Sequence, residues 1–477
     1  MIKQIIIIII IVLFAYNTYS QNEVDALRYS QTFNGGTARY VGMGGALGAV
    51  GGDLSTTYNN PAGLGVYRKS QFTFTPNLVF NSTSSAYIDR VSNDFRTNFN
   101  INNVGVVSSF VNDNKSTLVA VNFAFSYNRK NNFHFNKDII GVNNNNSMTD
   151  YFADNSNGYA IDELSDFGER LAWETYSINS VDSINYVYES ALQNYGELQR
   201  RTIETKGHMS EGDFSVGINI ANKLFWGGTI GIVWTRFYSD MYHTEQEDTA
   251  NIDNFNYFYY DEHLQTKGTG VNFKTGIIYK PFYFLRLGAA IHSPTFLTLD
   301  DYYYTYMDAS FDDVGRNYSY SPDLYQKYGF NTPGKLLGSA AFFIKKVAII
   351  SFDYEMIDYS WAKYDDSYNF DNNYQNLVID NTYTIAHNFK VGAEYRYNIF
   401  SFRAGAAYYG SPFKSYIQDS HSVAYSGGIG VNYNVFFLDF AYLHQQNSVK
   451  YYMYTTSPAA TITSYSNKFM MTLGFRF

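Results

Sequence analysis

Apolar and polar residues alternate with a period of two over most of the chain after residue 67. In the clearest segment, residues 118–128, Val119 and Phe123 fall on one face while Ala120 and Asn122 fall on the other. A strand places successive side chains on opposite faces, so this pattern predicts strands whose two faces meet different surroundings. Comparable segments begin near residues 71, 101, 116, 212, 226, 268, 283, 335, 346, 384, 399, 422, 435 and 466. We therefore predict about fourteen strands.

The less apolar face of these segments is rich in Gly, Ala, Ser and Asn, with isolated charges. A soluble sandwich alternates too, but its outer face is densely charged and solvated. Short turns such as Asn222-Lys223 and Lys345-Lys346 alternate with long loops rich in Asp, Asn and Tyr. In bacterial barrels the short turns are periplasmic and the long loops extracellular, which places both termini in the periplasm. We predict an all-β fold, a transmembrane antiparallel β-barrel over residues 68–477.

Composition agrees with a barrel that spans a membrane. Aromatic residues make up 19% of the 477 residues and charged residues only 16%, which is unusual for a soluble protein. No apolar run reaches the roughly 20 residues that a transmembrane helix needs. The formal net charge of -9 and the scarcity of Lys/Arg clusters argue against nucleic acid as a partner. Lys3 and an apolar core up to Ala15 predict a secretory signal over residues 1–20, cleaved near Ser20.

A glycine-rich stretch, residues 37–67, lies between this signal and the first strand. Glycines let a backbone approach other surfaces closely and adopt left-handed dihedral angles. Asp53 supplies an N-cap for one short helical turn, and the sequence from Asn60 predicts a stop followed by a turn. A short helix is predicted ahead of the stretch, over residues 23–31. The candidate residues of this motif are Gly42, Gly44, Gly45, Asp53, Asn60, Pro61, Ala62 and Gly63.

The order of these motifs resembles the N-terminal hatch of the FadL/TodX family of outer-membrane transporters. The resemblance implies that residues 21–67 fold into the barrel lumen and block it. It also implies passive uptake of hydrophobic small molecules, either long-chain fatty acids or aromatic hydrocarbons, across the Gram-negative cell outer membrane. Phe475 and Phe477 on the last strand resemble the C-terminal signal read by the barrel-assembly machinery. The expected partners are outer-membrane lipid, that machinery and the hydrophobic ligand; a monomer without cofactor or metal is expected.

A lumen enclosed by about fourteen strands leaks unless something occupies it. Charges on the lumen-facing positions have mixed signs, so they offer partners for polar groups of the hatch, or they form a solvated wall that pairs with itself. Glycines at Gly392, Gly405 and Gly428 leave room for a ligand or for the hatch, and both alternatives stay open. The lumen-facing charged candidates are Lys274, Arg286, Asp353, Glu355, Lys390, Glu394, Arg396, Arg403 and Asp439.

One loop, residues 158–206, departs from the two-residue period. Apolar residues recur there at helical spacing, which predicts a helical hairpin on the extracellular rim. This hairpin is either the place where substrate first settles, as the resemblance implies, or a packed cap that binds no ligand. The residues of the stripe are Ile184, Val187, Tyr188, Ala191, Leu192, Tyr195 and Leu198.

Catalytic interpretations fail on geometry. His292 and Ser293 are neighbours on a strand, so their side chains point to opposite faces and cannot form a nucleophile and base. The eight histidines are scattered without a metal-binding spacing, and the acidic loops lack EF-hand spacing. We therefore expect no enzyme. The main alternative to a channel is a structural or adhesive barrel that presents its long loops to a partner without transport.

Overall fold

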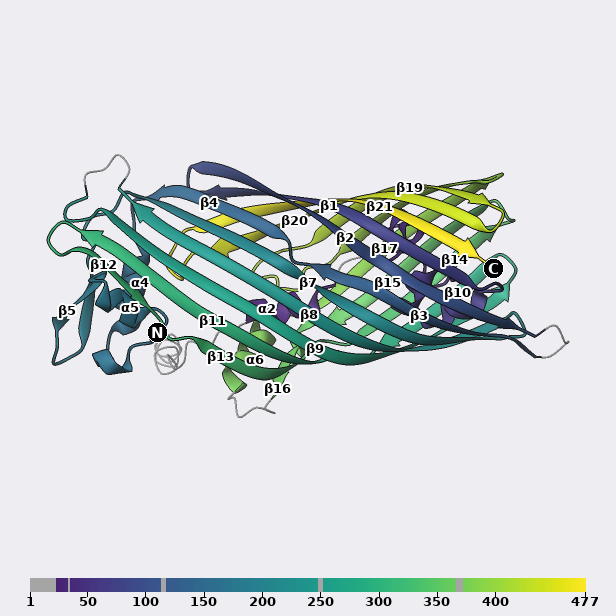
Figure 1. Cartoon of the computed structure of the whole chain (residues 1–477), viewed down its shortest axis with the longest axis horizontal. Coiled ribbons are helices and arrows are strands. Elements are labelled where there is room, and N and C mark those ends of the chain that lie inside the picture. The colour runs from purple at the N-terminus through teal and green to yellow at the C-terminus, as the bar shows by residue number, and fades with distance from the viewer. Residues whose placement is uncertain (1–22, 33–34, 113–116, 248–251, 366–371) are drawn as a thin grey trace.

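The computed structural model describes residues 23–32, 35–112, 117–247, 252–365 and 372–477. Its body is a closed antiparallel barrel of 14 strands in which the last strand pairs with the first (Figure 1). This confirms the predicted fold class, and each predicted start falls within, or at most two residues before, a different barrel strand. Around the wall, the barrel strands are β1 (Gln71–Tyr87), β2 (Arg90–Val111), β3 (Leu118–Asn132), β7 (Glu197–Ile220), β8 (Leu224–Gln246), β9 (Tyr257–Phe282), β10 (Leu285–His292), β14 (Lys335–Ile344), β15 (Ala348–Asp358), β17 (Ile385–Tyr397), β18 (Phe400–Tyr409), β19 (Ser422–Tyr433), β20 (Phe436–Tyr452) and β21 (Ala459–Arg476).

The alternation in sequence becomes an outside and an inside of this wall. On β3, Phe123 and Phe125 are about half exposed on the outer face, while Asn122 and Ser126 are fully buried inside. The other barrel strands repeat the pattern, so the outer face is an apolar band suited to lipid. At the seam, β21 pairs with β1. The rings of Phe475 and Phe477 stack there with their centroids 5.6 Å apart, and their recognition by an assembly machinery stays a prediction.

The wall continues beyond the barrel at one end, which we call the loop end and which lies at the left in Figure 1. Strands β7, β8 and β9 are 24, 23 and 26 residues long, and further strands pair with these extensions. On one side β11 pairs with both β9 and β13, and on the other β4 pairs with β7. The additional strands are β4 (Phe135–Asn143), β11 (Phe296–Phe311), β12 (Gly315–Tyr320), β13 (Leu324–Asn331) and β16 (Lys363–Asp365).

Two prolines divide neighbouring strands of this side. Pro294 separates β10 from β11, and Pro333 separates β13 from β14. Proline has no N–H to donate to a ladder, so both sites are breaks in regular pairing. Side chains replace part of the ladder, because the Ser293 hydroxyl accepts a hydrogen bond from the Phe273 N–H and the Thr332 hydroxyl accepts one from the Thr295 N–H, both at 2.9 Å. The wall therefore stays joined across the two breaks.

The long loop between β3 and β7 corrects one prediction. The predicted helix along the stripe from Ile184 to Leu198 is wrong, because Val187 begins a strand and Leu198 lies at the start of β7. The Asp182 carboxylate accepts the backbone N–H groups of Ile184 and Asn185, which closes a tight turn where the helix was expected. Helices do occur between β3 and β7, but the first of them, Met148–Ser156, lies before residue 158, where the predicted helical loop begins. The loop elements are α4 (Met148–Ser156), η3 (Ile161–Glu163), α5 (Glu169–Glu174), β5 (Ile178–Asp182) and β6 (Val187–Ser190).

The remaining helices lie near the N-terminus and in the loop after β15. The predicted helix over 23–31 is confirmed by α2. Among the residues described, no helix has the length and apolar character needed to cross a bilayer. The predicted secretory signal, residues 1–20, lies outside the described residues. These helices are α2 (Glu23–Ser30), α3 (Ala38–Gly42), η1 (Leu54–Thr57), η2 (Pro61–Val66), η4 (Tyr359–Trp361) and α6 (Asn373–Thr382).

Candidate functional site

Residues 35–67, which we call the N-terminal segment, cross the inside of the barrel at the end opposite the long loops, the turn end. Helix α3 contacts β18, β19, β20 and β21, whereas η2 contacts β3, β7, β8 and β9. These two groups of strands lie in different parts of the wall, so the segment reaches from one to the other. Nearly every residue of the segment is buried. The glycine-rich stretch is therefore enclosed by the barrel along most of its length.

Caps organise the segment locally. The Asp53 carboxylate accepts hydrogen bonds from the Ser55 N–H at 2.9 Å and from the Thr37 hydroxyl at 2.8 Å, as the predicted N-cap requires. At Asn60 the structure differs from the predicted stop and turn, because a 3-10 helix begins there with Pro61 at its first position. Proline suits that position because its missing N–H has no helical partner to lose. The Asn60 side chain also donates to the Gly48 carbonyl at 2.7 Å.

Glycines of the wall make room for this segment. A Cβ on Gly392 would lie 2.3 Å from the Met43 carbonyl oxygen, and one on Gly405 would lie 2.2 Å from the Gly44 nitrogen. Such separations are impossible for a side chain, so the two backbones touch only because both positions lack one. A Cβ on Gly428 would lie 3.5 Å from the Gly42 Cα, which is ordinary contact. Of the two open alternatives, the space at these glycines is filled by the N-terminal segment.

The opposite part of the wall repeats this arrangement around the Asn60 motif. A Cβ on Gly227 would lie 2.2 Å from the Pro61 carbonyl oxygen, and one on Gly276 would lie 2.1 Å from Asn60 Oδ1. Within the segment, Gly44 and Gly45 adopt positive φ angles of 62° and 77°, which side chains disfavour. Ala62 and Gly63 lie in η2 beside Phe225 and Thr56, respectively. The predicted hatch motif thus forms the contact surface with the wall.

A buried carboxylate joins the segment to β17 and β18. Glu394 accepts Arg39 Nε at 2.9 Å and Arg403 Nε at 2.7 Å, and Arg396 pairs with it from the rim at 2.5 Å. Arg403 also pairs with Asp439 at 2.6 Å. Burial alone would lower the pKa of the Arg39 guanidinium, but Glu394 and then Asp53 hold that pKa above its ordinary value. Arg39 therefore stays charged and tied to the wall.

A further group of charges lines the wall. Lys274 pairs with Glu211 at 2.6 Å and with Asp213 at 2.9 Å, and Asp213 accepts the Thr57 hydroxyl of the segment at 3.3 Å. Lys130 approaches Glu211 from β3 at 3.4 Å. All these groups are largely buried, so each charge has to keep its partner.

The other predicted charges also face inward. Asp353 accepts the Gly48 N–H at 2.9 Å, so it too holds the segment. Glu355 pairs with Lys390 at 3.7 Å. Arg286 donates to a segment carbonyl, that of Val50, and its guanidinium lies 4.5 Å from the centre of the Phe343 ring. The predicted lumen charges therefore either contact the N-terminal segment or pair with one another.

Some charged residues of this site were missed. Arg39 lies in the segment, and Lys335 on β14 donates to the Thr32 hydroxyl at 2.5 Å. Glu211 and Asp213 flank the predicted strand start at residue 212, at positions of equal parity. Asp213 lies inside the predicted strand, and extending the alternation by one residue would have added Glu211 to the same face. Lys335 stands at a predicted strand start but was not assigned to a face.

Above the N-terminal segment, toward the loop end, the lumen contains a buried apolar group that we call the aromatic cluster. Helix α2 lies inside it: the Tyr29 ring meets Phe133 and Phe330 edge-on, each with centroids 6.4 Å apart. The Arg28 guanidinium lies 3.9 Å from the centre of the Phe237 ring. The aromatic cluster comprises Ala26, Tyr29, Phe133, Met209, Val233, Phe237, Leu297, Leu299, Tyr328, Phe330, Ile357, Tyr359, Ala362, Tyr364, Ile379, Tyr383 and Ala386.

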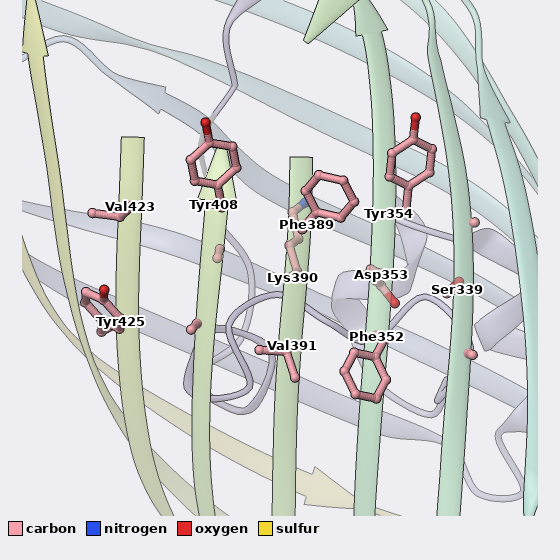
Figure 2. Close-up of a pocket in the computed structure, with 14 residues that line it drawn as sticks. Ser339, Phe352, Asp353, Tyr354, Phe389, Lys390, Val391, Tyr408, Val423 and Tyr425 are labelled. Atoms are coloured by element: carbon pink, nitrogen blue, oxygen red, sulfur yellow. The ribbon is translucent and has the colours of Figure 1, made fainter. Parts of the chain in front are cut away.

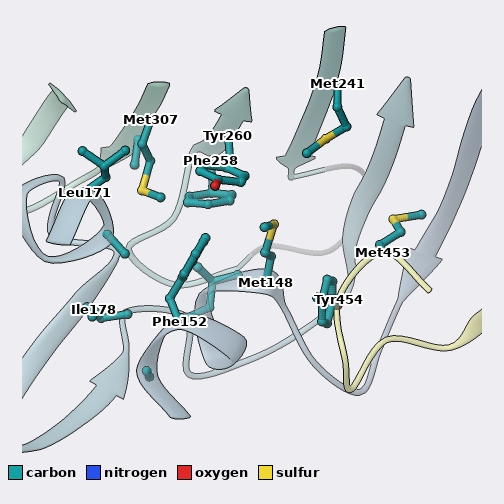
Figure 3. Close-up of a cluster of buried hydrophobic side chains, with 14 of the residues drawn as sticks. Met148, Phe152, Leu171, Ile178, Met241, Phe258, Tyr260, Met307, Met453 and Tyr454 are labelled. Atoms are coloured by element: carbon teal, nitrogen blue, oxygen red, sulfur yellow. The ribbon is translucent and has the colours of Figure 1, made fainter. Parts of the chain in front are cut away.

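A second apolar group, the methionine cluster, lies under the loop helices (Figure 3). Phe152 from α4 and Leu171 from α5 meet side chains of β8, β9 and β11 there. The two clusters follow each other along the inward face of β8, where Met241 belongs to the methionine cluster and Phe237 to the aromatic cluster. The methionines of the methionine cluster are Met148, Met241, Met307 and Met453.

An apolar groove of about 560 Å³ lies elsewhere, on β14, β15, β17, β18 and β19 (Figure 2). The side chains that wall it, such as Phe352, Phe389 and Tyr408, are exposed on the outer face of the barrel. The alternate residues Asp353 and Lys390 are buried inside. Asp353 and Lys390 also contribute to the lining of the groove, whose apolar side chains face lipid.

His292 and Ser293, the neighbouring histidine and serine of the sequence analysis, both form structural hydrogen bonds. His292 Nε2 lies 2.8 Å from the Asn59 carbonyl oxygen, and the Ser293 hydroxyl donates to the Pro294 carbonyl at 2.8 Å. His292 thus contacts the N-terminal segment, and Ser293 bonds within the wall. Within the described ranges, no group of three or more His, Cys, Asp or Glu side chains is arranged to hold a metal ion.

No family model and no curated protein matches the sequence. Among solved structures, a FadL homologue of Pseudomonas aeruginosa superimposes with a TM-score of 0.59 and 12% identity, over 94% of this chain and 99% of that one. The toluene transporter TodX of P. putida superimposes with a TM-score of 0.52 and 12% identity, over 93% of this chain and 99% of that one. At such identity the likeness shows the fold. The chain has the fold of the FadL/TodX outer-membrane channels.

Proposed function

We propose that this protein is an outer-membrane channel for passive uptake of hydrophobic small molecules, of the class of long-chain fatty acids or aromatic hydrocarbons. The observation that carries the proposal is the succession of two buried apolar clusters inside a closed barrel. They begin under the helices of the loop end and lead down to the N-terminal segment. With the loop end outside the cell, this path starts where the ligand arrives.

Apolar surface supplies the driving force for entry. Moving apolar area from water into such a cluster gains roughly 25 cal/mol per Å². The entrance suits ligands of varied shape because methionine side chains are flexible and polarisable. A toluene transporter and a FadL homologue share the fold, which supports this class of ligand.

The N-terminal segment is the proposed hatch. Its backbone meets wall glycines on two sides, and Arg39 is held by a buried carboxylate. Because the segment packs this closely against the wall, we expect it to keep ions and water from crossing the barrel. An apolar ligand would enter on the loop-end side of the segment. The hatch would govern the last step of passage, and the clusters the first.

The proposal is tested by uptake of radiolabelled oleate or toluene into cells that lack the gene and carry it on a plasmid. Phe330 is fully buried in the aromatic cluster, so Phe330→Glu places a charge on the proposed path. We expect uptake to fall by about ten-fold or more, because a buried charge repels an apolar ligand. Phe330→Leu keeps the path apolar and is expected to change uptake by less than about three-fold.

Folding is checked by the altered gel mobility that intact barrels show before heating. If cells with the folded wild-type protein take up oleate and toluene no faster than cells without it, the channel proposal is wrong. Uptake as fast in folded Phe330→Glu as in Phe330→Leu would place the path elsewhere in the lumen.

A further inference from the structure

The outward face of the wall extension at the loop end is covered by tyrosines from β8, β9, β11, β12 and β13. The alternate residues of these strands, such as Phe237, Phe258 and Met307, are buried inside. In Figure 1, β8, β9 and β11 run side by side along this part of the wall. We call this surface the tyrosine face; its tyrosines are Tyr238, Tyr242, Tyr257, Tyr259, Tyr302, Tyr304, Tyr306, Tyr318, Tyr320 and Tyr325.

The tyrosine face lies beyond the lipid band. On β9 the outward residues from Tyr279 to Val271 are mostly apolar, whereas those from Thr269 toward the loop end are polar. A tilted strand gains roughly 2.5 Å of height per residue. Tyr302 pairs with Gln265, so it lies about 15 Å above Val271, and the other tyrosines of β9, β11 and β12 lie higher. Aromatic residues that anchor a barrel gather at the membrane interface itself, so anchoring does not explain this face.

The rings are held in place with their faces exposed. Tyr302 and Tyr325 have centroids 4.9 Å apart, and Tyr306 and Tyr320 have centroids 4.5 Å apart. The Tyr302 hydroxyl donates to Asp323 at 3.0 Å, and the Tyr306 hydroxyl donates to an aspartate at 2.9 Å. Tyr320 and Tyr325 keep 64% and 74% of their surface in solvent. A ligand would meet rings that are already ordered, at a low entropic cost.

The polar residues between the rings compensate one another. Arg316 pairs with Asp308 at 2.6 Å, and His263 lies 2.9 Å from Asp240. The outward positions from 236 to 246, 257 to 267 and 300 to 310, all of them described, hold no aliphatic side chain. A protein interface has a dry apolar core, and this surface has none. Flat aromatic rings among hydroxyl, amide and carboxylate groups suit sugars, whose C–H faces stack on rings and whose hydroxyls form hydrogen bonds.

We propose that the tyrosine face binds saccharide chains of the lipopolysaccharide that surrounds the barrel. The face points sideways, parallel to the membrane, at the height where these chains leave the outer leaflet. Its compensated charge favours uncharged stretches of the chain over phosphate groups. This binding holds the protein in the polysaccharide layer and involves no transport, so it is independent of the proposed channel.

The test uses the full chain reconstituted in phospholipid nanodiscs. The probe is the lipid-free polysaccharide released from lipopolysaccharide by mild acid, and binding is measured by calorimetry. The triple variant Tyr304→Ser, Tyr320→Ser, Tyr325→Ser is expected to bind about ten-fold more weakly or worse, because the stacking surfaces are lost. The matched triple change to Phe keeps the rings and should stay within about three-fold of wild type.

Tyr433→Ser, at the turn end, serves as the control and should bind like wild type. The proposal is overturned if the wild type does not bind the lipid-free polysaccharide, or if lipid A stripped of that polysaccharide competes as well as the whole lipopolysaccharide. It is also overturned if the folded serine variant binds as tightly as wild type. Should the serine variant fail to fold, the phenylalanine variant decides: binding lost with the hydroxyls alone excludes ring stacking.

Discussion

The two halves of the lumen are filled by different chemistry. Toward the turn end, the N-terminal segment meets the wall through glycines such as Gly392 and through ion pairs such as Arg39–Glu394. Toward the loop end, the filling is apolar side chains: the aromatic cluster around Tyr29 and the methionine cluster around Met148. The turn half adds backbone contact and paired charge to the packing of its apolar side chains, whereas the loop half is filled mainly by the packing of apolar side chains.

This difference teaches which half can adapt. A backbone that touches another backbone has no rotamer to change, and a buried charge that loses its partner is costly. Apolar side chains, methionine above all, can repack around a guest at small cost. We infer that the turn half decides whether the barrel is closed, while the loop half accepts ligand.

The largest effect is expected at Glu394, where three arginines meet one buried carboxylate. Glu394→Ala leaves Arg39 and Arg403 without this partner in the interior. Removing one member of a buried ion pair costs about 3 to 5 kcal/mol, so the free energy of unfolding should fall by that amount. Urea unfolding in liposomes, followed by tryptophan fluorescence, measures it. Asp419→Ala, which removes an exposed carboxylate beside His421, is the control and should leave the unfolding curve unchanged.

The second effect concerns the glycines of the wall. Gly392→Val drives a side chain into the Met43 carbonyl, so the N-terminal segment cannot seat as it does now. We expect the free energy of unfolding to fall by about 1 to 3 kcal/mol. We also expect the variant to conduct ions in planar bilayers, whereas the wild type should not. Gly338→Val is the matched control, because a Cβ at Gly338 meets nothing within 4 Å. Equal conductance of the two variants would show that the segment does not seal the barrel.

The sequence predicted the barrel well where its two faces differ. Lipid on one side and a polar lumen on the other impose the alternation seen on β3, and such strands were found at the right places. The loop-end extensions were missed because water lies outside them: on β9, Asp261, His263 and Gln265 interrupt the apolar face. The stripe at Ile184–Leu198 misled because a hairpin turn and a strand start matched helical spacing by chance.

The candidate site was predictable in part. Parity along a strand placed Lys390 and Glu394 on the inward face without knowledge of the fold. Their partners were not predictable, because Arg39 lies 355 residues from Glu394 in sequence and only closure of the barrel joins them. The same holds for Gly44 against Gly405: composition suggested close approach, but the surface approached depended on how the segment lies in the lumen.

A smaller effect is expected at Asn60. Its side chain accepts the Ala62 N–H at 3.2 Å and donates to the Gly48 carbonyl, so Asn60→Ala removes a cap and one tie within the segment. We expect a loss of about 0.5 to 2 kcal/mol and, if the segment is the hatch, faster leakage of small ions from liposomes. Asn60→Asp keeps the cap acceptor but loses the donor, so its stability should lie between those of the wild type and Asn60→Ala. An unchanged unfolding curve in Asn60→Ala would show that the ends of the segment hold it without this motif.

The smallest effect is expected when the same substitution, Met to Leu, is made once in each half of the lumen. Met148→Leu in the methionine cluster replaces a flexible side chain by a branched one of similar volume, and its neighbours can shift, so we expect less than about 1 kcal/mol of lost stability. Met43→Leu makes the same change where the Met43 backbone is pressed against Gly392 and Gly405, and the loss should be larger, up to about 1.5 kcal/mol. Urea unfolding of both variants in the same liposomes measures the difference. Equal losses would mean that the loop half is packed as rigidly as the turn half, and an apolar guest would then need more than side-chain repacking to enter.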